Sequence, residues 1–295
     1  MKEIWSKERR STSTSTSKDV RSVFQQDYDR LLFSTPVRRL ADKTQVWPMD
    51  ENDGVRTRLR HSHEVSNLAR SIGYRVFLEI GETSPLFESV DFLVDIQPVL
   101  MSIGLAHDLG NPPFGHQGEA AICKWFSDRE EWIFSRREEG GIKLHDAVTP
   151  AQMKEFTKFD GNPQTLRLLS SLQTHIKGFG LDLSAATLAA SIKYPVGYGE
   201  ICAENKIKKK AGYFSTEQDI VDWIWRETGL SGKRHPLTWI MEACDDIAYS
   251  ILDVDDILKK EIISPDDVVK RLATKVRGES VYNKLVEKFS EIESE

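Results

Sequence analysis

The sequence predicts a mainly α-helical fold, and two observations support this. Apolar residues recur at helical spacing in several segments, most clearly in residues 236–259, where Pro236 occupies the first helical position. No alternation of short strand and helix patterns indicates a parallel sheet. The glycines of the string GFGLDL also allow a small β-hairpin around residues 173–183.

The other elements are expected in order along the chain. Residues 1–26 contain the polar tract STSTSTS and are expected to form a flexible arm. An Arg-rich segment at 27–43 and a short extended piece at 44–48 precede a helix at 61–80. A helix from Pro98 to Gly110 follows the preference for proline at the start and glycine at the end. Further helices are expected at about 116–127, 163–176, 184–193 and 217–228, with a core over 27–260 and a C-terminal helical extension over 261–295.

Composition limits the class of protein. The 295 residues carry a net charge of −6, with 39% hydrophobic and 29% charged residues, which is typical of a soluble globular protein. No apolar run reaches the length that spans a bilayer, and the N-terminus lacks the apolar segment of a secretory signal. The three cysteines form no CxxC pair, which argues against a disulfide framework or a thiolate zinc site. We therefore expect a cytoplasmic protein.

Two basic clusters stand out, because an acidic chain must concentrate positive charge locally to bind a polyanion. The first, RTRLR at 56–60, comes directly before His61. The second, KIKKK at 206–210, is interpreted as a solvated loop in preference to a binding surface.

The string AHDLG at 106–110 places a histidine and a carboxylate at the end of an apolar helix. The Asp108 carboxylate would face the negative end of the helix dipole, and burial would add to the cost of its charge. A divalent cation would neutralise Asp108 and accept the neutral imidazole of His107 as a ligand. For an isolated His-Asp pair, a packed histidine beside a solvated aspartate is commoner than a metal site. The presence of further ligands therefore decides between these two interpretations.

Two further residues supply such ligands. His61 lies at the start of an expected helix, and Asp245 lies on an acidic face of the helix at 236–259. With His107 and Asp108 they give two nitrogen and two oxygen ligands from separate helices. This mixed set suits Mn²⁺ or Mg²⁺, and Fe, Co, Ni or Zn are also compatible.

His116 and Glu119 are three residues apart and share one helix face, so Glu119 can orient His116 for proton transfer. The turn GNPPFG places this pair next to the metal-ligand candidates, and its two prolines restrict the loop. The alternative is a surface His–Glu pair at a helix end, which contributes little. His63, two residues from His61, points to a different side of its helix and is expected to be structural.

The pattern His61…His107-Asp108…Asp245 resembles the ligand set of the HD-domain metal-dependent phosphohydrolases, which implies an HD-domain helical core. The surrounding strings are similar to the deoxyguanosinetriphosphate triphosphohydrolase (dGTPase) branch of this family. A bare His-Asp pair is weak evidence, whereas six strings in the family's order, covering most of 27–256, are specific. The strings are DYDRLLFSTPVRRLADKTQVWP (27–48), RTRLRHSHEVSNLAR (56–70), GLAHDLGNPPFGHQGEAAI (104–122), FDGNPQTLRLL (159–169), KYP (193–195) and EACDDIAYSILDVDD (242–256).

The resemblance implies an enzyme that converts a dNTP, dGTP above all, and water into a deoxynucleoside and intact triphosphate. It implies that a divalent metal is held by the four ligands named above. His116 and Glu119 would then be the catalytic pair, which activates water or protonates the leaving oxygen.

Substrate contacts are also implied by the resemblance. Lys193 and Tyr194 match the phosphate-contacting KYP string, and Asn162 matches the GN motif near the substrate. For the arginines Arg39 and Arg58 two alternatives stay open, contact with phosphate or pairing with nearby acids. The positions expected to contact the sugar are Gln45, Tyr249 and Asp253.

Two other functions remain alternatives. Another HD phosphohydrolase, such as a nucleotidase or phosphodiesterase, would share the metal ligands but would not need Tyr249 or the KYP string. A non-catalytic nucleotide- or nucleic-acid-binding scaffold is the third interpretation, because family members usually continue past SEIESE with helices that supply phosphate-binding residues. The resemblance further implies a homo-oligomer, as a hexamer or a smaller even form, with regulation by single-stranded DNA as an open question and no membrane partner.

Overall fold

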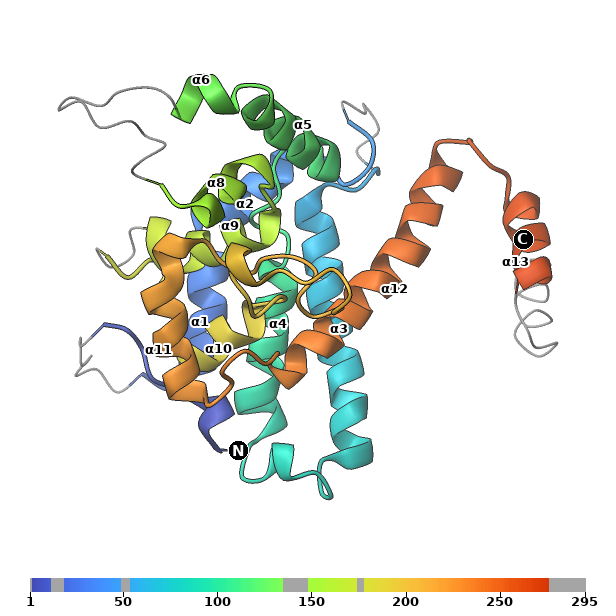
Figure 1. Cartoon of the computed structure of the whole chain (residues 1–295). Coiled ribbons are helices and arrows are strands. Elements are labelled where there is room, and N and C mark those ends of the chain that lie inside the picture. Colours follow the sequence, from blue (N-terminus) through green and yellow to red (C-terminus); the bar gives the residue numbers. More distant parts are fainter. Residues whose placement is uncertain (1, 12–18, 49–53, 135–147, 174–177, 276–295) are drawn as a thin grey trace. The chain divides into compact units, whose positions relative to one another are not determined.

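The computed structural model describes residues 2–11, 19–48, 54–134, 148–173 and 178–275. Helices dominate these residues, which confirms the predicted mainly α fold (Figure 1). The described residues contain an isolated antiparallel bridge between Thr44 and Thr57 but no named strand. The hairpin expected around 173–183 is therefore not supported by the described part of that range, and its residues 174–177 lie outside it.

The chain divides into two compact units. The first comprises residues 1–49 and 56–248, and the second comprises residues 50–55 and 249–295. We expected the core to end at residue 260, whereas the first unit ends earlier, at Ala248, within helix α12. The second unit contains the remainder of α12 and helix α13, Pro265–Lys275.

The first unit is a bundle of helices joined by short 3₁₀ and π segments. The principal α-helices are α1 (Val23–Leu32), α2 (Thr35–Arg39), α3 (Arg58–Ile80), α4 (Gln97–Ala106), α5 (Gly115–Ser127), α6 (Glu130–Phe134), α8 (Pro150–Thr157), α9 (Gly161–Arg167), α10 (Ala185–Ser191), α11 (Gln218–Thr228) and α12 (Pro236–Lys259). The π-helical segments Phe92–Ile96 and Leu168–Leu172 directly precede α4 and follow α9.

Helix α4 is the centre of the core. Its residues Val99, Leu100, Ile103 and Leu105 are almost completely buried, and α1, α3 and α10 pack around it (Figure 1). Burying one such aliphatic side chain contributes about 1.5–3 kcal/mol to folding, which accounts for an almost uniformly apolar helix at this place. The metal-ligand candidates His107 and Asp108 directly follow its C-terminal end.

Every helix expected from periodicity forms, but two bounds differ in an informative way. The helix expected from Pro98 to Gly110 ends at Ala106, because His107 to Gly110 form a turn instead of a further helical turn. The helix expected at 163–176 is an α-helix only to Arg167 and then becomes π-helical. Helices α1, α2 and α8 were not expected, since their short apolar patterns are interrupted by charged residues.

The flexible arm expected at residues 1–26 is wrong for residues 2–11, which pack against the first unit. Ile4 and Trp5 are buried, and the indole N–H of Trp5 donates to the carbonyl of Leu86 at 3.0 Å. Two apolar side chains of this size bury enough surface to hold a short segment on the core. Residues 12–17 of the STSTSTS tract lie outside the described residues.

The buried imidazole of His235 predicts how acid affects stability. Burial lowers the pKa of His235 to about 4, and its Nε2 lies 3.2 Å from the carbonyl oxygen of Ile4. Between the ordinary value of 6.5 and about 4 the unfolded chain binds more protons than the folded chain. The free energy of unfolding should therefore fall as pH decreases through this window, by up to about 1.4 kcal/mol per pH unit from this residue.

Urea unfolding from pH 7 to 4 checks this, with His235→Gln as the comparison. Carboxylates titrate in both proteins, so the difference between their two profiles of unfolding free energy against pH gives the contribution of His235. The wild-type protein should lose more stability than the variant below about pH 6.5. Parallel profiles would contradict the lowered pKa of His235.

Glycine at position 104 allows α3 and α4 to approach closely. A Cβ atom there would lie 2.6 Å from the Cα of Ser66. Because this is a backbone atom, it cannot move aside as the end of a flexible side chain can. We expect Gly104→Ala to destabilise the protein by about 1–3 kcal/mol, the usual cost of overpacking a core. Gly199→Ala is the control, because its nearest neighbour, the Cβ of Ala151, would be 3.9 Å away. Equal midpoints in thermal unfolding for the two variants would refute the close approach.

Candidate active site

Four side chains from three helical segments meet at the C-terminal end of α4. His61 lies in the first turns of α3, His107 and Asp108 follow α4, and Asp245 lies on α12 within the first unit. The candidate ligand atoms of His61, His107 and Asp108 all lie within 4.8 Å of one another. Asp245 Oδ1 lies 3.1 Å from Nε2 of His61 and 3.4 Å from Nε2 of His107.

The orientation of His107 is determined by its backbone neighbour. Nδ1–H donates to the carbonyl of Gly104 at 2.7 Å, which directs Nε2 toward the carboxylates of Asp108 and Asp245. This Nε2 atom is buried, has no hydrogen-bond partner, and lies 3.7 Å from Oδ1 of Asp108. A buried Nε2 atom directed at two carboxylates fits a metal ligand better than a packed core histidine.

Asp108 is held by two other side chains. Arg58, the first residue of α3, forms an ion pair with Asp108 Oδ2, and Asn111 donates from Nδ2 to Asp108 Oδ1 at 2.6 Å. Arg58 therefore pairs with an acid, which is one of the two alternatives left open by the sequence.

The electrostatics of this group are those of a cation site. Burial disfavours protonation of His107, but the carboxylates of Asp108 and Asp245 outweigh this and raise the pKa of the imidazole to about 9. Burial also opposes ionisation of Asp108, but the adjacent His107 and Arg58 lower its pKa below the ordinary value. For Asp245 the same opposition between burial and the two histidines again gives a lowered pKa. The imidazolium of His107 and the guanidinium of Arg58 balance the carboxylates of Asp108 and Asp245, and a divalent ion would take the place of the imidazolium proton.

His116 and Glu119 lie on the first turns of α5. Nδ1 of His116 is 2.6 Å from Oε2 of Glu119, and Glu119 Oε1 accepts a hydrogen bond from the backbone N–H of Gly161 at 2.8 Å. The His116 side chain is 83% exposed and that of Glu119 only 10%. A buried carboxylate fixed by the backbone orients an imidazole whose Nε2 is free to exchange protons, which is more than a surface pair at a helix end provides.

A cavity of about 310 Å³ joins these groups. It brings together most of the residues expected from the sequence, since seven of its lining side chains belong to the predicted metal, catalytic or phosphate sets. Its lining is His107, Asp108, Asn111, His116, Glu119, Asn162, Thr165, Ser191, Lys193, Tyr194, Lys209, Lys210, Met241 and Asp245.

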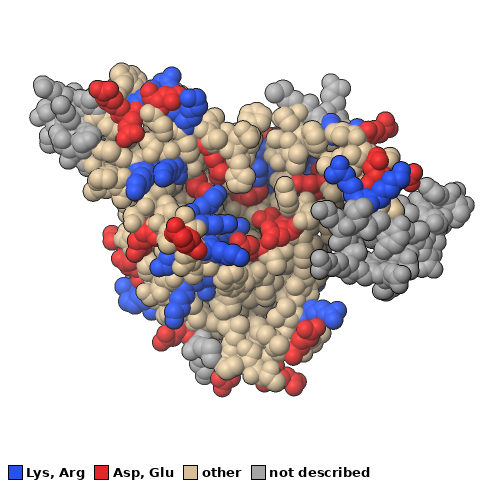
Figure 2. All heavy atoms as spheres, turned by 45° about the vertical axis from the view of Figure 1, so that its right-hand side comes forward, with Lys and Arg blue, Asp and Glu red and all other residues tan. Residues whose placement is uncertain are grey.

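Basic residues of the KIKKK cluster also line this cavity. We interpreted the cluster as a solvated loop, and Lys209 is indeed exposed, but Lys209 and Lys210 also line the cavity, which the sequence did not indicate. Lys210 Nζ lies 2.6 Å from Oδ2 of Asp160, whose other oxygen accepts from the backbone N–H of Asn162 at 2.9 Å. Figure 2 shows Lys and Arg side chains gathered beside a hollow of this face with acidic side chains in it. Charge alone could not indicate which lysines turn inward.

Lys193 and Tyr194 follow α10 and occupy another wall of the cavity. Lys193 Nζ lies 3.4 Å from Oε1 of Glu242, and the Lys193 carbonyl accepts from Nε of Arg234 at 2.6 Å. Burial and the charge of Glu242 raise the pKa of Tyr194 to about 12, so its hydroxyl keeps its proton and can donate a hydrogen bond.

The structure does not bring every expected substrate residue into the cavity. Gln45 does not line it, although its buried Oε1 has no hydrogen-bond partner. Arg39 lines a different cavity, together with Lys43. Tyr249 and Asp253 lie on the part of α12 that belongs to the second unit, so their expected sugar contacts stay predictions. Asn111, Thr165 and Ser191 line the cavity but were not expected as site residues.

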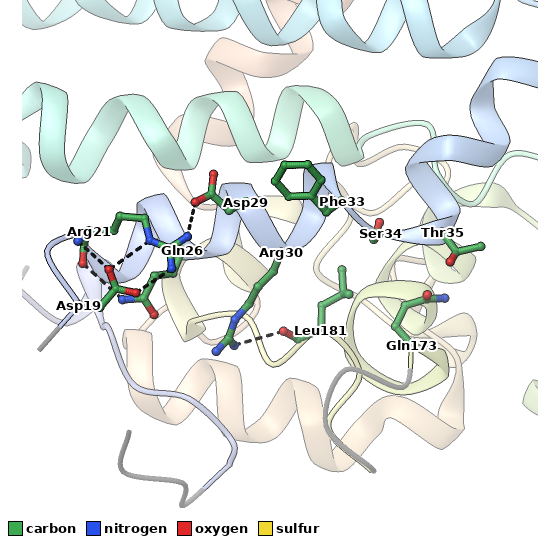
Figure 3. Close-up of a pocket in the computed structure, with 10 residues that line it drawn as sticks. All are labelled: Asp19, Arg21, Gln26, Asp29, Arg30, Phe33, Ser34, Thr35, Gln173 and Leu181. Carbon is green, nitrogen blue, oxygen red and sulfur yellow. Dashed lines mark hydrogen bonds and ion pairs between the residues drawn. The ribbon is translucent and has the colours of Figure 1, made fainter. Parts of the chain in front are cut away.

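A larger cavity of about 580 Å³ lies beside α1, and its chemistry differs (Figure 3). Its charged side chains largely neutralise one another, since Arg21 pairs with Asp19 and Asp29 at 2.7 and 2.6 Å. It contains no histidine and none of the metal-ligand candidates. The smaller cavity is therefore the candidate active site because of its titratable groups and not because of its volume.

Comparison with known proteins identifies related chains. The chain is 41% identical over 270 residues to the deoxyguanosinetriphosphate triphosphohydrolase-like protein of Listeria monocytogenes, with 90% of this chain covered. It is 39% identical over 251 residues to the protein of the same name from Synechocystis sp., with 80% covered. It is 34% identical over 278 residues to the deoxyguanosinetriphosphate triphosphohydrolase of Klebsiella pneumoniae, with 87% covered. The chain belongs to the deoxyguanosinetriphosphate triphosphohydrolase family.

Three further findings describe this member of the dGTPase family. The chain spans 57% of the Listeria relative and 54% of the Synechocystis and Klebsiella relatives, so it matches a little over half of their length. No protein-family model matches it. Among the described residues, no helix is both long enough and apolar enough to cross a membrane.

Proposed function

We propose that the chain carries the catalytic site of a metal-dependent dNTP triphosphohydrolase, which converts dGTP or a related dNTP and water into a deoxynucleoside and triphosphate. The observation that carries the proposal is the single cavity that joins His107, Asp108 and Asp245 to the His116–Glu119 pair and to Lys193, Tyr194, Lys209 and Lys210. A metal site, a proton-transfer group and a cluster of cations are the three parts that hydrolysis of a polyphosphate ester needs.

The donor set supports a divalent metal, and the proposed ligands are His61, His107, Asp108 and Asp245. The fit rests on the buried, unpartnered Nε2 of His107 and on the close grouping of the other ligand atoms. When bound, a divalent ion would supply Lewis-acid polarisation of a phosphate oxygen and a water of lowered pKa. We expect Mn²⁺ or Mg²⁺, while the nitrogen and oxygen donors also suit Fe, Co, Ni or Zn.

His116 is proposed to transfer the proton, with Glu119 as its orienting partner. The hydrogen bond at 2.6 Å directs the imidazole and stabilises its protonated form after a water has been deprotonated. Returning that proton to the 5′-oxygen of the leaving deoxynucleoside would complete the cycle.

The cations on the cavity walls are proposed to bind the triphosphate. Lys209 and Lys210 enter from one loop and Lys193 from another, so the charges converge on one volume. Asp160 and Glu242 hold two of these ammonium groups at 2.6 and 3.4 Å, which keeps them in place before substrate arrives. Asn162 and Tyr194 add neutral hydrogen-bond donors for phosphate oxygens.

The test is a panel of dNTPs and NTPs with Mn²⁺ or Mg²⁺, with products separated by anion-exchange chromatography. Intact triphosphate and a deoxynucleoside are expected, with dGTP among the best substrates. Release of pyrophosphate or orthophosphate would indicate cleavage of a different bond and would favour the alternative of a nucleotidase or phosphodiesterase. Tight binding of dGTP without turnover in any metal would favour a non-catalytic scaffold.

Replacing Lys210 tests the proposed phosphate-binding wall. Lys210→Gln should raise KM for dGTP by about 10-fold or more, because a desolvated charge–phosphate contact contributes about 1.5–3 kcal/mol. Lys206→Gln is the matched control from the same loop, since Lys206 does not line the cavity. Equal KM values for the two variants, measured by steady-state kinetics, would remove Lys210 from the site.

The remaining expectations concern the whole protein. We propose a homo-oligomer, as a hexamer or a smaller even form, from the family resemblance, and a cytoplasmic location from the composition and the cysteine pattern. Regulation by single-stranded DNA is part of the same proposal. Size-exclusion chromatography with light scattering, with and without an oligonucleotide, tests the assembly and the DNA contact together.

A further inference from the structure

The N-terminus of helix α10 is capped by its own Ser184, whose hydroxyl accepts from the N–H of Thr187, and by distant parts of the chain. The backbone N–H groups of Ala185 and Ala186 donate to the carbonyls of Glu8 and Ser6 at 2.9 and 3.1 Å. The N–H of Ser184 donates to Oδ2 of Asp27 at 3.0 Å. A helix leaves its first N–H groups without internal partners, so these contacts satisfy donors that burial would otherwise leave unpaired.

Asp27 connects the two capping segments. Its side chain is completely buried, and Oδ2 also accepts from the hydroxyl of Ser184 at 2.5 Å. Its Oδ1 lies 2.7 Å from NH1 of Arg9, whose own side chain is only 15% exposed. A buried carboxylate at a helix N-terminus is stabilised by the dipole as well as by its cation.

Arg9 and its neighbours fasten the N-terminal segment. Arg9 NH2 donates to the carbonyl of Val23 at 3.1 Å, and Arg10 NH1 donates to the carbonyl of Ser170 at 2.8 Å. The Ser11 hydroxyl donates to Asp182 at 2.8 Å, which places the end of the segment beside α10 as well. Figure 3 shows Arg30 reaching from α1 to the carbonyl of Leu181, next to Asp182.

The opposite end of α10 leads directly into the candidate active site. Ser191, the last residue of the helix, lines the cavity, and Lys193 and Tyr194 follow immediately. Helix α10 has only seven residues, too few for a stable isolated helix, and is buried from Ala185 to Ala190, so packing and caps determine its position. A shift at its first turn is therefore transmitted to the residues at its end.

We propose that residues 6–9 together with Asp27 form a brace, here called the N-terminal brace, that positions Lys193 and Tyr194 for substrate binding through helix α10. The inference rests on the proposed role of Lys193 and Tyr194 in binding the triphosphate. The metal ligands and His116 lie on α3, α5 and α12 and in the turn after α4, so the brace is expected to change substrate affinity more than the chemical step. Arg9 and Asp27 are positioning residues and do not touch the substrate.

Neutralising Asp27 tests the brace, with its neighbour Asp29 as the control. Asp27→Asn should raise KM for dGTP by about fivefold or more while kcat and Mn²⁺ affinity stay within about twofold. Asp29→Asn removes a carboxylate from the same helix, but its partner is the half-exposed Arg21, so KM should not change. If Asp27→Asn does not fold, Arg9→Gln replaces it, because this variant keeps the contacts between Asp27 and Ser184.

Hydrogen exchange and a double-mutant cycle separate positioning from a merely structural role. Backbone amides of 185–194 should exchange faster in the brace variant at a temperature where the far-UV spectrum is native. Adding Asp27→Asn to Lys193→Gln should raise KM much less than it does in the wild-type background. Additive effects on KM, or a loss of kcat in proportion to the folded fraction, would overturn the proposal.

Failure of the proposed function can be recognised independently. If no variant hydrolyses dGTP, binding of inorganic triphosphate is measured by calorimetry in the wild-type, Asp27→Asn and Asp29→Asn proteins. Weaker binding in Asp27→Asn alone would support the brace even though the reaction was assigned wrongly. Equal affinities in all three proteins would overturn it.

Discussion

Asp108→Asn is expected to abolish activity by removing the charge that holds the divalent ion. The amide keeps the shape of the carboxylate and can still accept from Asn111, so the turn after α4 should persist. Its oxygen is a much poorer ligand beside His61 and His107. We expect Mn²⁺ affinity to fall at least about 100-fold and turnover to fall below detection. Losing a residue that only orients a metal ligand typically lowers metal affinity about 10–100-fold, and losing a ligand should cost at least as much.

Asp108→Ala should differ from Asp108→Asn in stability. Truncation leaves Arg58, whose side chain is only 8% exposed, without a carboxylate. Breaking a buried ion pair on one side typically costs about 3–5 kcal/mol, so this variant should unfold at a lower temperature as well. Asp128→Asn, which removes an exposed partner of Lys124, should change neither property. Normal Mn²⁺ binding by Asp108→Asn in isothermal calorimetry would show that the metal is held elsewhere.

His116→Gln is expected to slow turnover while leaving the metal in place. A positioned acid or base contributes about 10²–10⁴ in rate, so kcat should fall by that factor. His116 lies on α5 and is bound to Glu119, while the proposed metal ligands are on other elements, so Mn²⁺ stoichiometry should not change. The stability effect should be small because the side chain is largely exposed.

Stopped-assay kinetics and metal analysis on the same preparation check this expectation. Glu119→Gln is the informative companion, since the amide keeps a polar contact to His116 but loses the charge that stabilises the imidazolium. Its kcat should lie between those of the wild type and His116→Gln. Loss of bound metal in His116→Gln would mean that this histidine is a ligand and not the proton-transfer group.

The long helices could be predicted because their apolar stripes reflect one dominant cause, burial against the core. The short ones could not, because caps and not periodicity define them. Helix α1 begins with a capping box in which Ser22 and Gln25 exchange hydrogen bonds at 3.0 and 3.1 Å. Helix α8 begins with the same arrangement between Thr149 and Gln152. Both signatures are visible in the sequence, but each is too short to distinguish from chance.

The metal and proton-transfer candidates could be predicted because their chemistry is costly without a partner. A cation stabilises a buried His-Asp pair at the end of a helix. The spacing of three residues between His116 and Glu119 places both side chains on the same helix face. The roles of Lys209 and Lys210 could not, because the folding of a loop determines which of several exposed lysines turn inward. The N-terminal segment was misjudged for a related reason, since Ile4 and Trp5 find their burial site only in the folded chain.

The most direct test of the central claim is anomalous diffraction from a crystal grown with Mn²⁺, recorded near the manganese absorption edge. The account predicts one strong peak bounded by His61, His107, Asp108 and Asp245. A peak at other residues, or a refined structure in which Asp245 turns away from the His107–Asp108 turn, would contradict it.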